Sequence, residues 1–408
     1  MSDAATSPGA ATPGYARPYA GLRVLDLSQG IAGPYCAMLL AQYGADVIKV
    51  EPFAGDWGRG LGKRVGSHSA IDLTANRGKR SIALDLKLAA GRTLLSRLAA
   101  CCDVVIENFR PGVVDRLGVG YAAVHAANPR VLYVSVSAFG QTGPSRDLPG
   151  SDTVAQAFSG MMMANRGDTG VPRSTGNLTS DYVTALYAFQ ALAAALAARP
   201  FEAEGRHLDV SLMHASAAFL AMKVIEGRLE GGPAPRLNAP AGSYRTRDGW
   251  IAITLTKEAH FPIMCRALGL PALAADPRFA DFAARAANLA ALAPLMQQAL
   301  LGKDTADWLA IFQAADVLAS RIHDFDSWLD DPQVQATAIV SEDTLSTAES
   351  VPWVKVPGAI HPEAGDARLL WPDIGEHADA ILRDLLALGT SEISALRDAG
   401  VLQPAYFG

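Results

Sequence analysis

Two aspartates, Asp152 and Asp181, have a setting in this 408-residue chain that could support covalent chemistry. Asp152 lies in the run GSDTVAQ, and Asp181 lies in LTSDYV, where a long apolar segment with helical character begins. An aspartate at a helix start most often caps the helix. The alternative is a carboxylate nucleophile that points into a pocket, and a helix N-terminus would favour its ionised form by roughly 0.3–1 kcal/mol. The residues alone leave both interpretations open.

Two glycine-containing turns could approach a ligand. The first, QGIAGP at 29–34, follows an apolar run, and Glu51 lies about 20 residues further on, as in nucleotide-binding turns. It lacks the glycine that lets the backbone approach a pyrophosphate, so NAD binding is disfavoured. The second, Gly140 to Gly143, follows a strand-like segment. Its N–H groups could meet a carbonyl oxygen, or it is a plain turn.

Other site classes find little support. The eight histidines form no HxH or HxxxH pair, so no metal site is expected, and no G-x-S-x-G elbow suggests a hydrolase. The four cysteines contain no CxxC pair, which favours a reducing, cytoplasmic location. Lys79, Arg80, Lys87, Arg110 and Arg116 are basic residues of the N-terminal half, and each by itself is expected to be an ordinary solvated surface charge.

Composition excludes several classes of protein. Half of the residues are apolar, 19% are charged and the net charge is −6, so disorder as the main state is excluded. A mildly acidic chain is a poor partner for nucleic acid or an anionic membrane. Residues 1–19 are rich in Ala, Pro and Gly and are expected to form a flexible tail. The apolar stretch 184–198 is shorter than the roughly 20 residues of a membrane span.

Strand-like and helix-like segments alternate through the first half of the chain. This alternation predicts an α/β fold with a Rossmann-like, doubly wound parallel sheet. The expected strands are 22–27, 45–50, 81–86, 103–106, 131–137 and 207–212, and the expected helices are 35–43, 90–100, 113–117, 121–127 and 181–198.

The second half changes character after a Pro- and Gly-rich stretch at 229–242. A hairpin is expected around Asp248-Gly249, followed by helical segments, an extended segment at 352–362 and a helix at 376–386.

Long blocks of the sequence resemble the class III CoA-transferase family, also called CaiB/BaiF. The blocks are LRVLDLSQGIAGPYCAMLLAQYGADVIKVEPFAGD (22–56), NRGKRSIALDLK (76–87), DVVIENFRPGVVDRLG (103–118), NPRVLYVSVSAFGQTGP (128–144), GSDTVAQAFSG (150–160), SDYVTALYA (180–188), EGRHLDVSLM (204–213), DPQV (331–334) and IGEHADAIL (374–382).

The resemblance implies an interlocked homodimer in which a smaller domain is inserted into a large Rossmann-like domain. The N-terminal part of the large domain is expected at 20–225, the small domain at 238–320, and a C-terminal part that completes the large domain at 330–408. It implies that Asp181 attacks an acyl-CoA thioester and that Asp152 is a second acid that orients or assists it. CoA is then passed to a small carboxylic acid, so acyl-CoA is a substrate and no tightly bound cofactor is expected. The positions that contact CoA in formyl-CoA transferase are matched by Ala32, Leu84, Lys87, Asn108, Phe109 and Arg116.

Three positions bear on which branch of the family the chain resembles. Ile31 and Pro52 replace a Gln and an Arg of formyl-CoA transferase, which speaks against formyl and oxalate specificity. The α-methylacyl-CoA racemases have a His beside the first acid, where this chain has Ser151, and serine cannot exchange an α-proton at neutral pH. The expected activity is therefore CoA transfer. An acyl-CoA racemase, a non-catalytic acyl-CoA-binding protein and a NAD oxidoreductase are the alternatives.

Overall fold

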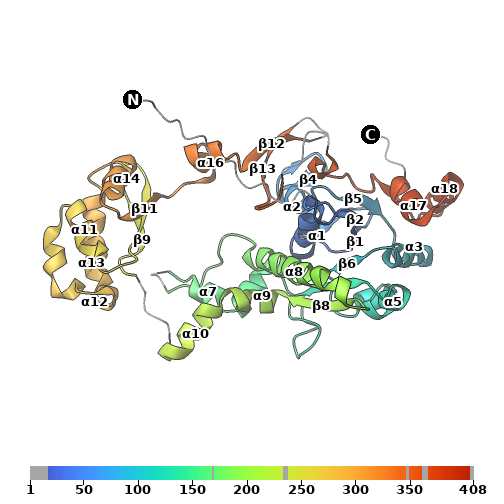
Figure 1. Cartoon of the computed structure of the whole chain (residues 1–408), viewed down its shortest axis with the longest axis horizontal. Coiled ribbons are helices and arrows are strands. Elements are labelled where there is room, and N and C mark those ends of the chain that lie inside the picture. The colour runs from blue at the N-terminus through green and yellow to red at the C-terminus, as the bar shows by residue number, and fades with distance from the viewer. Residues whose placement is uncertain (1–16, 168–169, 233–237, 346–348, 361–365, 405–408) are drawn as a thin grey trace. The chain divides into compact units, whose positions relative to one another are not determined.

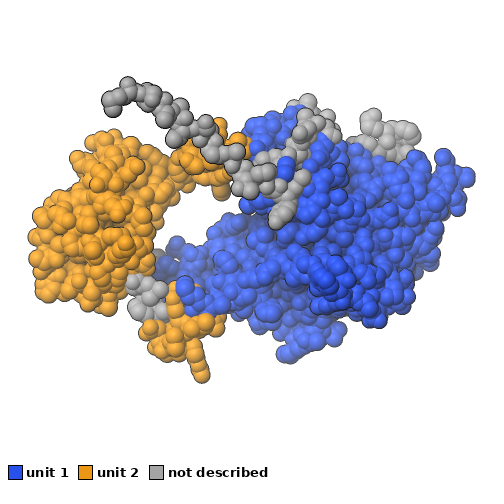
Figure 2. All heavy atoms as spheres, viewed as in Figure 1, with its two compact units in different colours: residues 1–222, 341–408 blue, residues 223–340 orange. Residues whose placement is uncertain are grey.

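The computed structural model describes residues 17–167, 170–232, 238–345, 349–360 and 366–404. The chain divides into two compact units (Figure 2). The large unit comprises the residues up to 222 together with 341–408, and the small unit comprises 223–340. Most of the expected flexible tail lies outside the described residues.

A six-stranded parallel sheet forms the centre of the large unit (Figure 1). Its strand order is β5-β2-β1-β6-β7-β8, so the chain winds outward from β1 in both directions. The prediction of an α/β fold with a parallel sheet is confirmed, and the strand bounds are β1 Arg23–Asp26, β2 Asp46–Glu51, β5 Arg80–Ala83, β6 Val104–Glu107, β7 Leu132–Ser137 and β8 Arg206–Ser211.

Helices bury both faces of this sheet, which explains why its inner strands are continuous apolar runs. Helices α3, α5, α17 and α18 cover one face, and α1 and α8 cover the other. Their bounds are α1 Ala32–Gln42, α3 Ala89–Ala100, α5 Tyr121–Ala127, α8 Thr179–Ala198, α17 Ala378–Leu386 and α18 Thr390–Asp398. The C-terminal segment therefore contributes to the core of the large unit.

Helix α1 begins earlier than the sequence pattern predicts. The expected start was residue 35, directly after Pro34, but the helix begins at Ala32. Proline is tolerated there because the first N–H groups of a helix have no partner within it. Ala32 is therefore the first residue of α1, and it directly follows the loop after β1.

Helix α8 packs its small side chains against α1 in the core of the large unit. Ala185, Ala188 and Leu192 are fully buried there. With the turn that follows it, the helix covers Thr179–Phe201 and is long and apolar enough to span a membrane by length and composition. The expectation that this segment is too short for a span is therefore wrong. Burial against α1 explains the apolar residues of one face only, since 33% of the most apolar window is buried.

The small unit contains an antiparallel sheet of order β11-β10-β9. The expected hairpin is confirmed, with Trp250 opposite Arg245. The bounds in and around this unit are α10 Ala221–Glu230, β9 Gly242–Arg245, β10 Trp250–Thr254, α11 His260–Ala267, α12 Phe282–Ala287, α13 Leu289–Leu300, α14 Thr305–Ala314, β11 Leu318–Arg321, α15 Phe325–Leu329 and α16 Pro332–Thr337. The remaining strands and α-helices are β3 Arg64–Val65, β4 His68–Ser69, α2 Ala70–Ala75, α4 Val113–Arg116, α6 Asp152–Phe158, α7 Met161–Ala164, α9 Leu212–Phe219, β12 Val340–Thr344 and β13 Ser350–Val354.

A buried charge network lies beneath the loop that follows β1. Lys79 donates to Asp26 at 2.7 Å, and Lys49 donates to Asp56 at 2.6 Å. Asp56 also accepts the backbone N–H of Gly30 at 2.9 Å, which fixes the loop itself. Burial alone would raise the pKa of Asp26, but the charges of Lys79 and Lys49 outweigh it and lower that pKa. Asp26 is therefore ionised, and the buried ion pairs hold the loop from below.

Replacing Lys49 by methionine should destabilise the large unit. Lys49→Met keeps the length of the side chain but leaves Asp56 buried without its cation, which typically costs about 3–5 kcal/mol. The loss is measured as a fall in the free energy of unfolding in urea.

Arg80→Met is the matched control. Arg80 pairs with Asp46 at a partly exposed site, where such pairs contribute about 1 kcal/mol or less. Equal destabilisation by the two variants would contradict the structural role assigned to the network.

Candidate active site

Two neighbouring cavities open in the large unit beside the carboxyl ends of the parallel strands. The apolar cavity has a volume of about 550 Å³, and the aspartate cavity, named for Asp152 and Asp181 in its wall, has a volume of about 370 Å³. Gln29 and Phe109 line both, so the two cavities adjoin. These residues follow β1 and β6, the strands between which the winding direction of the sheet reverses, and ligands of such sheets bind at this point.

Asp152 caps the helix that carries Asp181. Asp152 is the first residue of α6, and its Oδ1 accepts the backbone N–H groups of Ser180 at 2.7 Å and Asp181 at 3.2 Å. Asp181 itself lies in the first turn of α8. Among the described residues, no side chain or backbone group donates a hydrogen bond to its carboxylate. The capping role that an isolated aspartate usually has therefore belongs to Asp152, and Asp181 remains available for chemistry.

Gln156 is a positioning residue that the sequence analysis missed. Its side chain is fully buried, and its amide nitrogen donates to Asp152 Oδ2 at 2.6 Å and to the carbonyl of Asn177 at 3.0 Å. Its amide oxygen accepts the N–H of Thr175 at 3.0 Å. One amide thus orients Asp152 and holds the segment that leads into α8. Only the spacing of four residues between Asp152 and Gln156 on one helix face could have indicated it.

Burial and the negative charge of Asp152 raise the pKa of Asp181 to about 7. The sequence argument that the helix start keeps this carboxyl ionised is thus wrong in direction. A helix end contributes well under one pKa unit at an exposed site, whereas burial beside a second carboxylate acts more strongly in the opposite sense. A carboxyl that titrates near neutrality is typical of groups that take part in chemistry.

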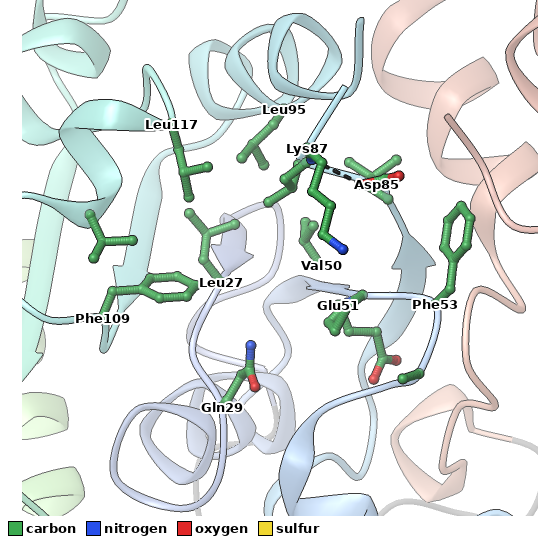
Figure 3. A pocket seen from close by; sticks show the side chains of 15 residues that line it. Leu27, Gln29, Val50, Glu51, Phe53, Asp85, Lys87, Leu95, Phe109 and Leu117 are labelled. Carbon is green, nitrogen blue, oxygen red and sulfur yellow. Dashed lines mark hydrogen bonds between the residues drawn. The ribbon is translucent and has the colours of Figure 1, made fainter. Parts of the chain in front are cut away.

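The residues expected to contact CoA are divided between the two cavities. Leu84 and Lys87 line the apolar cavity, Ala32 and Asn108 line the aspartate cavity, and Phe109 lines both. In Figure 3 the side chains of Lys87 and Phe109 extend toward the middle of the apolar cavity. Arg116, at the exposed end of α4, is not among the lining residues of either cavity.

Asn108 joins the two loops that meet at the site. Its Oδ1 accepts the N–H of Gln29 at 2.8 Å, and its Nδ2 donates to the carbonyl of Gln29 at 2.7 Å. The loop after β1 is therefore bonded to the loop after β6 through both backbone groups of one residue. This pair of hydrogen bonds fixes the boundary between the two cavities.

Neither glycine turn has the contacts that the functions considered for it would need. The N–H of Gly140 is bonded to Ser137 and the N–H of Gln141 to Asp209, so this turn does not present those donors to the aspartate cavity. Glu51 is held by Arg59 at 2.9 Å and by Ser81 at 2.6 Å. Its carboxylate is thus committed to buried partners, which argues against a ribose-binding role.

Comparison with protein families shows what the chain is similar to. The sequence profile described as CoA-transferase family III matches residues 19–378. The chain is 33% identical over 382 residues to succinate–glutarate CoA-transferase of Agrobacterium fabrum, covering 90% of this chain and 96% of that protein. It is 32% identical over 398 residues to human succinyl-CoA:glutarate CoA-transferase, covering 95% of this chain and 90% of that protein.

Solved structures show the same relationship. A CaiB/BaiF family protein from Brucella suis is similar to this chain with a TM-score of 0.80 and 32% identity, covering 91% of this chain and all of that one. Rv3272 from Mycobacterium tuberculosis superposes with a TM-score of 0.76 and 28% identity, covering 90% of this chain and 99% of that one. The similarity extends through both units of the chain.

Asp181 should titrate near pH 7, and removal of the charge of Asp152 should lower its pKa. Asp152→Asn keeps an oxygen that accepts the N–H of Ser180 but removes the neighbouring charge, so less free energy opposes ionisation of Asp181. Carboxyl ¹³C NMR should show a resonance with a midpoint of about 7, which moves to lower pH in Asp152→Asn.

Asp181→Asn identifies the resonance in this experiment. Burial also raises the pKa of Glu107 to about 7, so two carboxyl resonances are expected to titrate there, and one should disappear in Asp181→Asn. A midpoint for Asp181 that is unaffected by Asp152→Asn would contradict the coupling.

Proposed function

The chain belongs to CoA-transferase family III, and we propose that it moves CoA from an acyl-CoA donor to a small carboxylic acid with Asp181 as the nucleophile. The proposal rests on one observation: the two cavities adjoin, because Gln29 and Phe109 line both. An apolar cavity of about 550 Å³ adjoins a smaller one that contains an aspartate without hydrogen-bond donors to its carboxylate among the described residues. A long, partly apolar thioester needs both parts, one for the carrier and one for the reacting carbonyl.

CoA occupies the apolar cavity in this proposal. Leu84 and Phe109 offer apolar surface to the adenine or the pantetheine chain, and Lys87 offers a cation to a phosphate. The pantetheine arm then passes between Gln29 and Phe109, which line both cavities, and brings the thioester to Asp181. Arg116 lies outside both cavity walls, so a contact with CoA would have to occur beyond them, at the surface.

The reaction exchanges one acyl bond for another at each step. An oxygen of Asp181 attacks the thioester carbonyl, the carbon–sulfur bond breaks, and CoA leaves as a thiolate, which gives a mixed anhydride. The thiolate attacks the aspartyl carbonyl, so the donor acid departs as a carboxylate and CoA remains as a thioester on Asp181. An acceptor carboxylate attacks this thioester and displaces the CoA thiolate, which gives a second mixed anhydride with Asp181. The thiolate then attacks the carbonyl of the acceptor, so the new acyl-CoA is formed and Asp181 is released as a carboxylate. No oxidant or external proton is required.

Asp152 acts as a positioning residue in this scheme. It holds the backbone N–H groups of Ser180 and Asp181, so it sets where the nucleophile lies without touching the reacting carbonyl. Its negative charge disfavours ionisation of Asp181 in the empty site. Once Asp181 is acylated its charge is lost, and the repulsion between the two carboxylates is relieved.

Small dicarboxylic acids are the proposed substrates. The similar proteins from Agrobacterium fabrum and human are named for succinate and glutarate, and one from Chloroflexus aurantiacus is named for succinyl-CoA and L-malate. A mass-spectrometric screen of CoA exchange should therefore detect transfer to C4–C5 dicarboxylates. Absence of transfer to every carboxylic acid tested would refute the proposed function.

We also propose a cytoplasmic homodimer. Helices α6, α8 and α9 pack against one another, and each leaves a large apolar side chain more than half exposed: Phe158 at 57%, Leu186 at 52% and Phe219 at 58%. Large exposed apolar side chains on three adjoining helices support a surface that a partner covers. The four cysteines are free, as is usual for proteins of a reducing compartment.

Asp181→Ala should abolish transfer and leave CoA binding intact, because the variant removes the nucleophile and leaves the apolar cavity unchanged. Asp181→Asn keeps the shape without the charge and should be equally inactive. Incubation of the wild type with acyl-CoA followed by hydroxylamine should modify Asp181, which mass spectrometry can locate. Substantial transfer by Asp181→Ala, or an adduct on Asp152, would overturn the assignment.

Two comparisons make this experiment specific. Lys87→Ala should show the complementary defect, weaker CoA binding with the aspartyl adduct still formed at saturating acyl-CoA. A 2-methylacyl-CoA incubated in deuterated water without an acceptor should gain no deuterium at its α-carbon at a catalytic rate. Rapid incorporation would favour the racemase alternative.

Sedimentation at micromolar concentration should show a species of twice the 42.8 kDa chain mass. Leu186→Glu places a charge on the exposed apolar surface of α8 and should shift the equilibrium toward monomer. Leu88→Glu, an exposed position on the opposite face of the sheet, should leave the mass unchanged. A monomeric wild type at this concentration would contradict the proposed assembly.

A further inference from the structure

Arg110 is the single cation among the described residues that line the aspartate cavity. The same wall carries two acids, Asp152 and Asp181. Its other polar side chains are neutral, including Gln29 and Asn108. An anionic substrate in this cavity is repelled by Asp152 and by ionised Asp181. Among the described lining residues, Arg110 is the one that attracts it.

The backbone holds Arg110 in a preformed turn. The chain leaves β6 through Asn108 and Phe109 and then runs Arg110-Pro111-Gly112-Val113. The N–H of Val113 donates to the carbonyl of Arg110 at 3.1 Å, and Gly112 has a φ of 81° and a ψ of −5°. Proline followed by glycine with this positive φ forms a type II turn, in which a residue with a side chain would be strained. The site thus presents Arg110 from a rigid loop.

The guanidinium of Arg110 has no ion pair or hydrogen bond with any residue that the structure describes. Three buried cations of the large unit are instead paired with carboxylates: Lys49 with Asp56, Lys79 with Asp26 and Arg59 with Glu51. Arg110 is exposed, and no carboxylate within the described ranges neutralises it. It therefore remains available to an anion from solution, and its planar fork matches the two oxygens of a carboxylate.

We propose that Arg110 binds the remote carboxylate of a dicarboxylic substrate whose other end reacts at Asp181. This inference rests on the proposed function, and it adds the residue that selects dicarboxylates over monocarboxylates. The acceptor attacks when Asp181 carries CoA as a neutral thioester, so Asp152 is then the remaining negative charge of the aspartate cavity. Arg110 offsets the second negative charge that a dicarboxylate brings and fixes which end faces the thioester.

The test compares succinate with butyrate, which has the same chain length and one carboxylate. With one donor acyl-CoA held constant, Arg110→Gln should lower the succinate-to-butyrate ratio of kcat/KM by about tenfold or more, as expected for a lost charge-assisted pair. The change should appear mainly as a higher KM for succinate. Arg110→Lys keeps the charge without the fork and should lose less.

Arg97→Gln is the matched control. Arg97 is an exposed arginine on α3 that lines neither cavity, so its removal should leave the ratio unchanged. An unchanged ratio in Arg110→Gln would overturn the inference. So would a loss seen as weaker CoA binding with the ratio preserved, because Arg110 would then serve a CoA phosphate.

Binding of succinate without turnover separates this inference from the proposed function. Saturation-transfer NMR on the free protein should detect succinate binding that weakens in Arg110→Gln and persists in Arg97→Gln. If the wild type exchanged no CoA but succinate binding depended on Arg110, the carboxylate site would be supported and the proposed CoA transfer would be refuted. If exchange occurred and neither the ratio nor binding responded to Arg110, the transferase would stand and the inference would fail.

Discussion

The buried ion pair between Lys49 and Asp56 is the constraint on which the position of the site depends. Asp56 also binds the backbone N–H of Gly30, so the pair reaches the loop that follows β1. A buried charge that loses its partner costs several kcal/mol of stability. A displacement of the loop that separated Asp56 from Lys49 would therefore be unfavourable. Asn108 then bonds to both backbone groups of Gln29 from the other side. The junction of the two cavities is thus fixed from two directions.

The two aspartates of the site perform different tasks because their surroundings differ. Asp152 accepts three hydrogen bonds. One comes from Gln156, and the other two come from backbone N–H groups at the start of α8, which they hold in place. Asp181 receives none from the described residues, and burial beside Asp152 raises its pKa to about 7. A poorly solvated carboxylate is more reactive toward a carbonyl than one stabilised by donors. The same contacts therefore position Asp181, the proposed nucleophile, and leave its carboxylate without stabilising donors among the described residues.

Most of the large unit could be predicted from periodicity, and the site could be predicted only in part. The apolar runs at β1, β2, β6 and β7 and the amphipathic helices were recognisable because burial on both faces of a parallel sheet leaves a strong pattern. Gln156 was not, because a single buried amide leaves no pattern along the chain. Arg110 was visible in the sequence only as a surface charge beside a Pro-Gly turn.

The α/β class, the family resemblance and the two candidate acids could be read from residue types and spacings along the chain. The folded chain was needed to show which acid caps the helix, that burial beside Asp152 raises the pKa of Asp181 to about 7, and that Glu51 pairs with Arg59. These properties arise from desolvation, hydrogen bonding and charge coupling, which depend on distances between segments far apart in the chain. Local sequence specifies which groups are present, and folding specifies which of them share an environment.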